Sequence, residues 1–166
     1  MMIVRMICRI NSNHVEKAEI MIRIIVEGPP IAKKRPRFAT RKTKAGKSFN
    51  MAYDVQTTES GRFLNDLKSQ VWKEPLSGPL VMCAMFFMPM PKSMPKYKQA
   101  LAAKGLLPHE KKPDLDNLIK FAKDCLNGIA YRDDSQVAFY GTPTGKRYDP
   151  RPRTEIRIYE FEEYFS

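Results

Sequence analysis

The sequence has few of the residues that build covalent cross-links or soft-metal sites. Its 166 residues include only three cysteines and two histidines. Cys8, Cys83 and Cys125 are widely spaced in apolar surroundings, which excludes a disulfide framework and a C-x-x-C motif and predicts buried thiols. His14 and His109 lie too far apart for the spacings that are typical of zinc sites.

Long hydrophobic runs are also lacking. The longest, Leu80 to Met88, falls short of the roughly 20 residues that a membrane helix needs, and it predicts a buried strand instead. The segment from Met1 to Ile10 carries two arginines and has no convincing small-residue cleavage site. We therefore expect no secretory signal, no membrane partner and a cytoplasmic protein.

Acidic residues are scarce relative to basic ones. The chain has 29 Lys and Arg against 18 Asp and Glu, which gives a formal net charge of +11. This excess favours a polyanionic partner, above all nucleic acid, because neutralising phosphates releases counterions. The alternative is a generally basic surface without a specific partner.

The length is typical of one domain. We expect residues 21–166 to form it. Residues 1–20 are either an additional strand and turn or an N-terminal extension ahead of an alternative start at Met21, and the sequence assigns them no role.

Basic residues gather in two stretches. Between Lys33 and Lys47 eight basic residues occur without an acid. This pattern predicts a mobile loop that grips phosphates, with Phe38 and Phe49 available to stack on bases, or alternatively a merely solvated loop. A second basic loop is predicted around residues 146–153, with Lys146, Arg147, Arg151 and Arg153. The residues that we predict to bind DNA or another nucleic acid are Lys33, Lys34, Arg35, Arg37, Arg41, Lys42, Lys111, Lys112, Lys146 and Arg147.

Hydrophobic periodicity predicts both strands and helices. Strands are expected at residues 21–26, 80–88, 136–140 and 154–161, the last of them in a terminal hairpin. Helices are expected at residues 54–72, 96–104 and 114–127, and the last is strongly amphipathic. The predicted fold class is α/β (α+β), a small mixed β-sheet packed with helices in a single domain.

Four aspartates and a lysine fall in and after the third predicted helix. Asp114 and Asp116 stand at its start, where a non-helical cap residue lets both carboxylates reach one cation. Asp133 and Asp134 stand just before the next strand, where the chain has had room to return to the start of the helix. Lys120 lies one turn beyond Asp116 and is placed to orient a phosphate.

These carboxylates suit Mg2+ or Mn2+, which prefer oxygen ligands and share them with water and substrate phosphate. Such an ion can activate water and offset negative charge in phosphodiester hydrolysis. From spacing alone an alternative stays equally open, in which Asp114 only caps the helix and Asp133 and Asp134 only form a turn.

The sequence around these acids resembles the RusA-like family of Holliday junction resolvases. The string KPDLDNLIK from Lys112 to Lys120 resembles the family's D-x-D-N-x-x-K signature, and YRDDSQ from Tyr131 to Gln136 resembles its D-D-x-Q signature. The likeness extends more loosely from Glu27 to the end of the chain.

The resemblance implies a homodimeric endonuclease that uses Mg2+ to resolve four-way DNA junctions by paired symmetric cuts, in recombination and repair. Asp114, Asp116 and Asp134 match the family's essential acids, and Lys120 matches its essential lysine. The metal ligands are then expected to be Asp114, Asp116 and Asp134, with Asp133 in support.

Asn117 and Asp124 match motif positions with supporting roles. Two features depart from the family pattern, namely the segment before Met21 and the long Met- and Pro-rich insert from Met88 to Gly105. DNA geometry or dimer contacts are expected to differ accordingly.

Other functions remain open at this level. One is a catalytically silent nucleic-acid-binding protein, in which the acidic residues only cap a helix and form a turn. Another is a nuclease of other branched DNA, such as flaps or forks. A ribosomal-type RNA-binding protein would account for the charge but would leave the acidic cluster without a purpose.

Overall fold

The computed structural model describes residues 22–34, 37–42, 48–53, 56–71 and 74–166. The predictions for Cys8, His14 and residues 1–20 lie outside these ranges. In chain order the elements are β1 (Ile22–Glu27), β2 (Arg37–Lys42), β3 (Ser48–Tyr53), α1 (Thr57–Gln70), β4 (Leu80–Pro89), α2 (Lys96–Ala103), α3 (Leu115–Leu126), the 3-10 turn η2 (Asp134–Gln136), β5 (Val137–Tyr140), β6 (Gly145–Asp149), β7 (Arg153–Glu160) and α4 (Phe161–Phe165).

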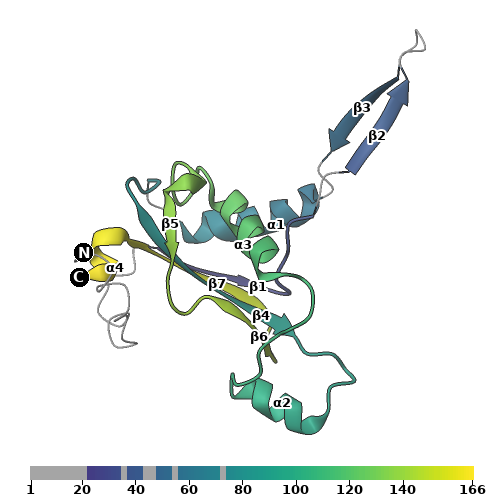
Figure 1. The fold of residues 1–166 in the computed structure, drawn as a ribbon, viewed down its shortest axis with the longest axis vertical. Helices are drawn as coiled ribbons and strands as arrows, with labels where there is room; N and C mark the ends of the chain where they lie inside the picture. The colour runs from purple at the N-terminus through teal and green to yellow at the C-terminus, as the bar shows by residue number, and fades with distance from the viewer. Residues whose placement is uncertain (1–21, 35–36, 43–47, 54–55, 72–73) are drawn as a thin grey trace, which may run out of the picture.

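β4 is the central strand of a mixed five-stranded sheet (Figure 1). It pairs with antiparallel β7 along one edge, and β1 adds to the far edge of β7, also antiparallel. The other edge of β4 pairs in parallel with β5 near its beginning and with β6 near its end. Strands enclosed in this way are apolar on both faces, and nine of the ten β4 residues are buried or half-buried. The prediction of a buried strand at 80–88 is confirmed.

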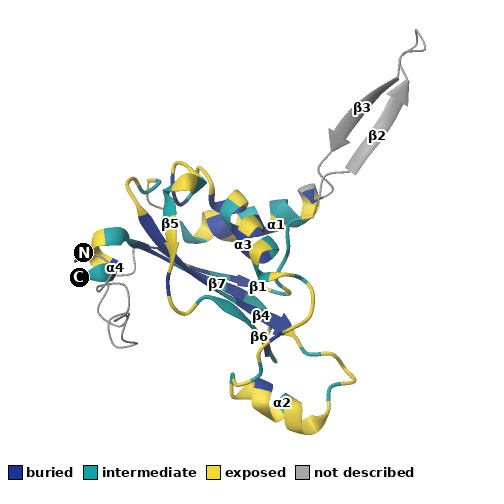
Figure 2. Cartoon of the chain, viewed as in Figure 1, coloured by how far each residue is buried: buried dark blue, intermediate teal, exposed yellow. Residues whose placement is uncertain are grey.

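One face of the sheet is covered by α1 and α3, which lie side by side over it (Figures 1 and 2). Alternate β4 side chains from Leu80 to Met88 join their core, because successive strand residues point to opposite faces. Phe63 of α1 meets Phe121 of α3 edge to face, with ring centroids 5.4 Å apart. The predicted apolar faces of both helices are therefore confirmed.

A smaller apolar cluster covers the opposite face near the start of β4. It contains Val81, Cys83, Tyr159 and Tyr164, the last from α4, a helix that was not predicted from the sequence. Cys83 and Cys125 are both buried free thiols, as predicted.

Two predictions about connections are wrong. The terminal hairpin does not form, because β7 pairs with β1 and β4, whereas β6, which precedes it, lies on the other side of β4. The second basic loop is largely strand, since Lys146 and Arg147 belong to β6 and Arg153 begins β7. Pairing with β4 decides both, and it involves partners far away in the sequence.

The first basic stretch is also not simply a loop. Arg37–Lys42 forms β2, which pairs with antiparallel β3 in a hairpin set apart from the main sheet (Figure 1). The two strands are joined by backbone hydrogen bonds, which form independently of side-chain charge. The prediction of a loop considered only the charge. No helix in the described part of the chain is long and apolar enough to cross a membrane.

Candidate active site

A hollow of about 610 Å³ lies between α3, η2 and the end of β5. It combines two carboxylates with two ammonium groups and one exposed phenol. The lining residues are Leu115, Asp116, Ile119, Lys120, Lys123, Asp134 and Tyr140.

α3 supplies one carboxylate and the two lysines. Asp116 and Lys120 are four residues apart and so lie one above the other on the helix. The opposite side of α3 is apolar and anchors the helix, since Leu118, Phe121 and Leu126 are fully buried against the sheet and α1. The helix thus has one orientation in which its charged side faces the hollow.

Asp114 is the N-cap residue of α3, with an extended backbone at φ −71° and ψ 147°. Its side chain makes no capping hydrogen bond to the helix, which speaks against the alternative in which Asp114 only caps the helix. Asp114 is exposed and lies just outside the lining of the hollow, two residues before Asp116. Its carboxylate is therefore not occupied by a structural role at the helix end.

The turn that carries Asp133 and Asp134 is held by Gln136. The Gln136 side-chain oxygen accepts hydrogen bonds from the N–H groups of Arg132 and Asp133, at 2.8 and 3.0 Å. Its side-chain nitrogen donates to the carbonyls of Leu76 and Gly78, which precede β4. One amide thus joins the acidic turn to the start of the central strand.

The two aspartates of this turn have different surroundings. Asp133 caps η2, accepting from Ser135 N at 2.9 Å, and hydrogen bonding to the side chain and then the backbone of Ser135 lowers the pKa of Asp133. Asp134 instead lines the hollow, and its Oδ2 lies 3.6 Å from Lys123 Nζ. The structure therefore brings Asp134 to Asp116 and Lys120, and leaves Asp133 in a capping role outside the hollow.

The described residues contain no cluster of three or more His, Cys, Asp or Glu side chains that could hold a metal ion. Asp116 and Asp134 nevertheless face one open hollow from two separate parts of the chain. Protein sites for Mg2+ commonly use only one or two carboxylates, with water and substrate phosphate completing the shell. This donor set therefore fits Mg2+, with Asp114 close by in the sequence as a further oxygen donor.

Two of the predicted DNA-binding lysines are engaged within the chain. Lys33 Nζ lies 3.0 Å from Asp124 Oδ2 on α3, and Lys34 Nζ lies 2.9 Å from Glu59 Oε1 on α1. The Lys33 N–H also donates to the Asn117 carbonyl at 2.9 Å. Asp124 and Asn117 thus fasten the segment after β1 to α3.

The other predicted basic residues differ in their surroundings. Lys111 and Lys112 are exposed just before Asp114. Lys146 and Arg147 turn toward the protein: the Lys146 ammonium bonds two backbone carbonyls, and the Arg147 guanidinium lies 4.8 Å from the centre of the buried Phe87 ring. Arg35, and the side chains of Arg37, Arg41 and Lys42, lie outside what the structure describes.

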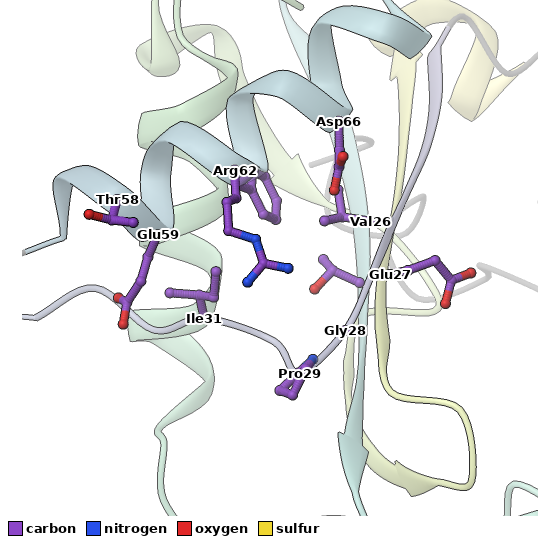
Figure 3. A pocket seen from close by; sticks show the side chains of 11 residues that line it. Val26, Glu27, Gly28, Pro29, Ile31, Thr58, Glu59, Arg62 and Asp66 are labelled. Carbon is purple, nitrogen blue, oxygen red and sulfur yellow. The ribbon is translucent and has the colours of Figure 1, made fainter.

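A second cavity, of about 240 Å³, lies between α1 and the segment that follows β1. Figure 3 shows Arg62 reaching from α1 into this space, with Glu59 and Asp66 on the same helix. The carboxylate of Glu59 is bonded by Lys34 and Gln56, and these bonds lower the pKa of Glu59. No residue of the two signature strings lines this cavity, so we place the candidate active site at the first hollow.

Two polar residues of the hollow were not predicted from the sequence. Lys123 carried a weak signal, because it lies one turn beyond Lys120 on the charged side of the helix. Tyr140 carried none, since only the pairing of β5 with β4 brings it to α3.

Comparison with known proteins gives the family of the chain. The profile of the family described as Endodeoxyribonuclease RusA matches residues 27–159, which include every element that forms the hollow. The chain therefore belongs to the RusA endodeoxyribonuclease family, a family of DNA-cleaving enzymes.

A relative in Bacillus subtilis (strain 168), "Uncharacterized protein YqaN", is 37% identical over 142 residues. The matched region covers 84% of this chain and 96% of that protein, so the similarity extends over most of both chains.

Proposed function

We propose that this protein is a structure-selective, Mg2+-dependent DNA endonuclease that resolves Holliday junctions by paired symmetric cleavage as a homodimer. The observation that carries the proposal is the meeting of Asp116 and Asp134 with Lys120 in one open hollow. A nuclease family supplies the reaction class, and the hollow contains the groups that the reaction needs.

In the proposed site Asp116 and Asp134 hold the divalent ion, with Asp114 as a further ligand. Mg2+ bound there would activate water and offset the charge that builds up on the phosphate. Lys120 orients the scissile phosphate through its exposed ammonium. Asp133 acts indirectly, because its cap fixes the turn on which Asp134 stands.

The net charge of +11 supports a DNA substrate, since the carboxylates of the hollow by themselves would repel phosphates. Exposed Lys111 and Lys112 lie next to the candidate ligands and are placed to contact the backbone on either side of the cut. A symmetric dimer offers one such site to each of two strands, which matches the symmetry of a four-way junction.

The test is incubation of the purified protein with a labelled synthetic four-way junction and with a matched linear duplex, in Mg2+ or in EDTA. We expect paired nicks confined to the junction, which EDTA abolishes. Asp116→Asn should lower the cleavage rate on the order of a hundredfold or more while junction binding persists. The control Asp66→Asn removes an exposed carboxylate from α1, away from the hollow, and should cut normally.

Tight junction binding by the wild type without any cutting would contradict the proposal and favour a silent binding protein. Cutting of flaps or forks with the junction left intact would retain the nuclease site and change its substrate. Sedimentation of the protein as a monomer when bound to the junction would remove the dimer from the proposal.

A further inference from the structure

Lys146 uses its ammonium group inside the protein. Nζ donates to the carbonyl of Lys111 at 2.7 Å and to the carbonyl of Pro113 at 2.6 Å. These two carbonyls flank Lys112, in the segment that leads directly into Asp114. Two of the three donor hydrogens of the ammonium are thus committed to one short stretch of backbone.

The backbone of Lys146 is itself fixed to the core of the sheet. Lys146 lies in β6, opposite Phe86 of β4, whose side chain is 1% exposed. The Lys146 carbonyl accepts from His109 N at 3.2 Å, and Tyr148 N donates to the Leu107 carbonyl at 3.0 Å. The segment before Lys111 is therefore tied to the outer edge of β6 by an isolated antiparallel bridge, in which Pro108 lies opposite Arg147.

These contacts form a continuous path from the sheet to the acids. β4 holds β6, β6 carries Lys146, and Lys146 holds the carbonyls that precede Asp114 and Asp116. Hydrogen bonds with a charged donor are stronger and more directional than neutral ones, so this clamp restricts the position of the loop. The loop in turn determines where α3 starts and where its first carboxylates lie relative to Asp134.

We propose that Lys146 is a positioning residue, which holds Asp114 and Asp116 in register with Asp134, and that it is not a contact to DNA phosphate. The inference rests on the proposed function for what the acids do. It goes beyond that function in assigning the geometry of the site to a residue on a distant strand.

The test compares Lys146→Met, Lys146→Arg and Lys112→Met with the wild type. Methionine keeps the apolar stem and removes the charge and the donors, whereas arginine keeps both. Lys112 is an exposed lysine of the same loop and serves as the matched phosphate contact. Junction affinity is measured in EDTA over a range of salt, and single-turnover cleavage is measured over a range of Mg2+ concentrations.

For Lys146→Met we expect junction affinity within about twofold of wild type and an unchanged salt dependence. The single-turnover rate should fall about tenfold or more, and half-saturation should need more Mg2+, because imperfectly supported metal ligands typically cost 10- to 100-fold. Lys146→Arg should recover most of the rate. Lys112→Met should instead weaken binding and reduce the salt slope by about one.

Hydrogen exchange of the peptide covering residues 110–120 tests the clamp independently of any activity. Faster exchange in Lys146→Met than in wild type, with other core peptides unchanged, is the expected result. Unchanged hydrogen exchange in Lys146→Met overturns the inference even if the enzyme is active. The inference is also overturned if Lys146→Met loses junction affinity and salt dependence as Lys112→Met does. A wild type that fails to cut junctions contradicts the proposed function, while the exchange result still decides the clamp.

Discussion

Lys123 Nζ lies 3.6 Å from Asp134 Oδ2, so an ammonium of α3 pairs with the candidate metal ligand on η2. The Lys123 side chain is 16% exposed and that of Asp134 is 44% exposed. A cation of the chain thus partly balances the carboxylate before any divalent ion binds. A metal ion at Asp134 has to bind next to this charge or displace it.

Removal of the Lys123 charge should therefore strengthen Mg2+ binding. We expect Lys123→Met to lower the Mg2+ concentration for half-maximal cleavage by a few-fold, which corresponds to about 1 kcal/mol for a partly exposed pair. The measurement is single-turnover cleavage against Mg2+ concentration, with Lys68→Met on the exposed side of α1 as the control. An unchanged or higher Mg2+ requirement would show that Lys123 does not compete with the ion.

Gln136 should be needed both for stability and for the position of Asp134. Its amide makes four hydrogen bonds across the turn, so Gln136→Leu leaves several backbone groups unpaired. We expect the free energy of unfolding in urea to fall by about 1–3 kcal/mol, and cleavage to fall more than junction binding. The control Gln99→Leu removes a side chain that donates one bond, to the Met94 carbonyl, and should have a smaller effect.

Gly141 has no room for a side chain. A Cβ there would lie 2.7 Å from both Cys83 Sγ and the Tyr164 hydroxyl oxygen, in the apolar cluster under α4. Gly141→Ala should lower the free energy of unfolding by about 1–3 kcal/mol, as overpacking does elsewhere. At Gly145 the nearest contact would be Met85 Sδ at 4.0 Å, so Gly145→Ala should change stability by less than about 0.5 kcal/mol. Equal effects of the two changes would contradict this reading of the packing.

His109 should make stability depend on pH. Its side chain is buried against Tyr148, and burial, followed by the charge of Lys146, lowers the pKa of His109 below its ordinary value of 6.5. The unfolded chain therefore takes up the proton more readily than the folded one. The free energy of unfolding should be greatest above pH 6.5 and fall as the pH drops through that value.

Urea unfolding at a series of pH values measures this dependence. His109→Gln should flatten the curve in that window, while His14→Gln leaves His109 in place and should retain it. A wild-type stability that rises as the pH falls through 6.5 would have the wrong sign for a buried neutral histidine.

Local patterns in the sequence determined several of the secondary-structure elements. The strand at Leu80–Pro89 was predictable from an unbroken apolar run, the helix at Lys96–Ala103 from the glycine that follows it, and the helix at Leu115–Leu126 from its hydrophobic periodicity. Each of these signals lies within a short stretch of the chain. Asp116 and Lys120 were predictable as a pair for the same reason. The signature strings identified Asp134, although nothing local to it indicates a neighbour on α3.

Tertiary structure decided the rest. The pairing of β6 with β4 converted a predicted loop into a strand and turned Lys146 toward the backbone before Asp114. The pairing of β5 with β4 brought Tyr140 to the hollow, and the position of η2 brought Asp134 to Lys123. Such contacts join residues that are distant in the sequence, and their free energy comes from burying β4 on both faces. No local pattern records which strands pair with β4, so the sequence determined the candidate groups of the site and the packing of the sheet decided which of them meet.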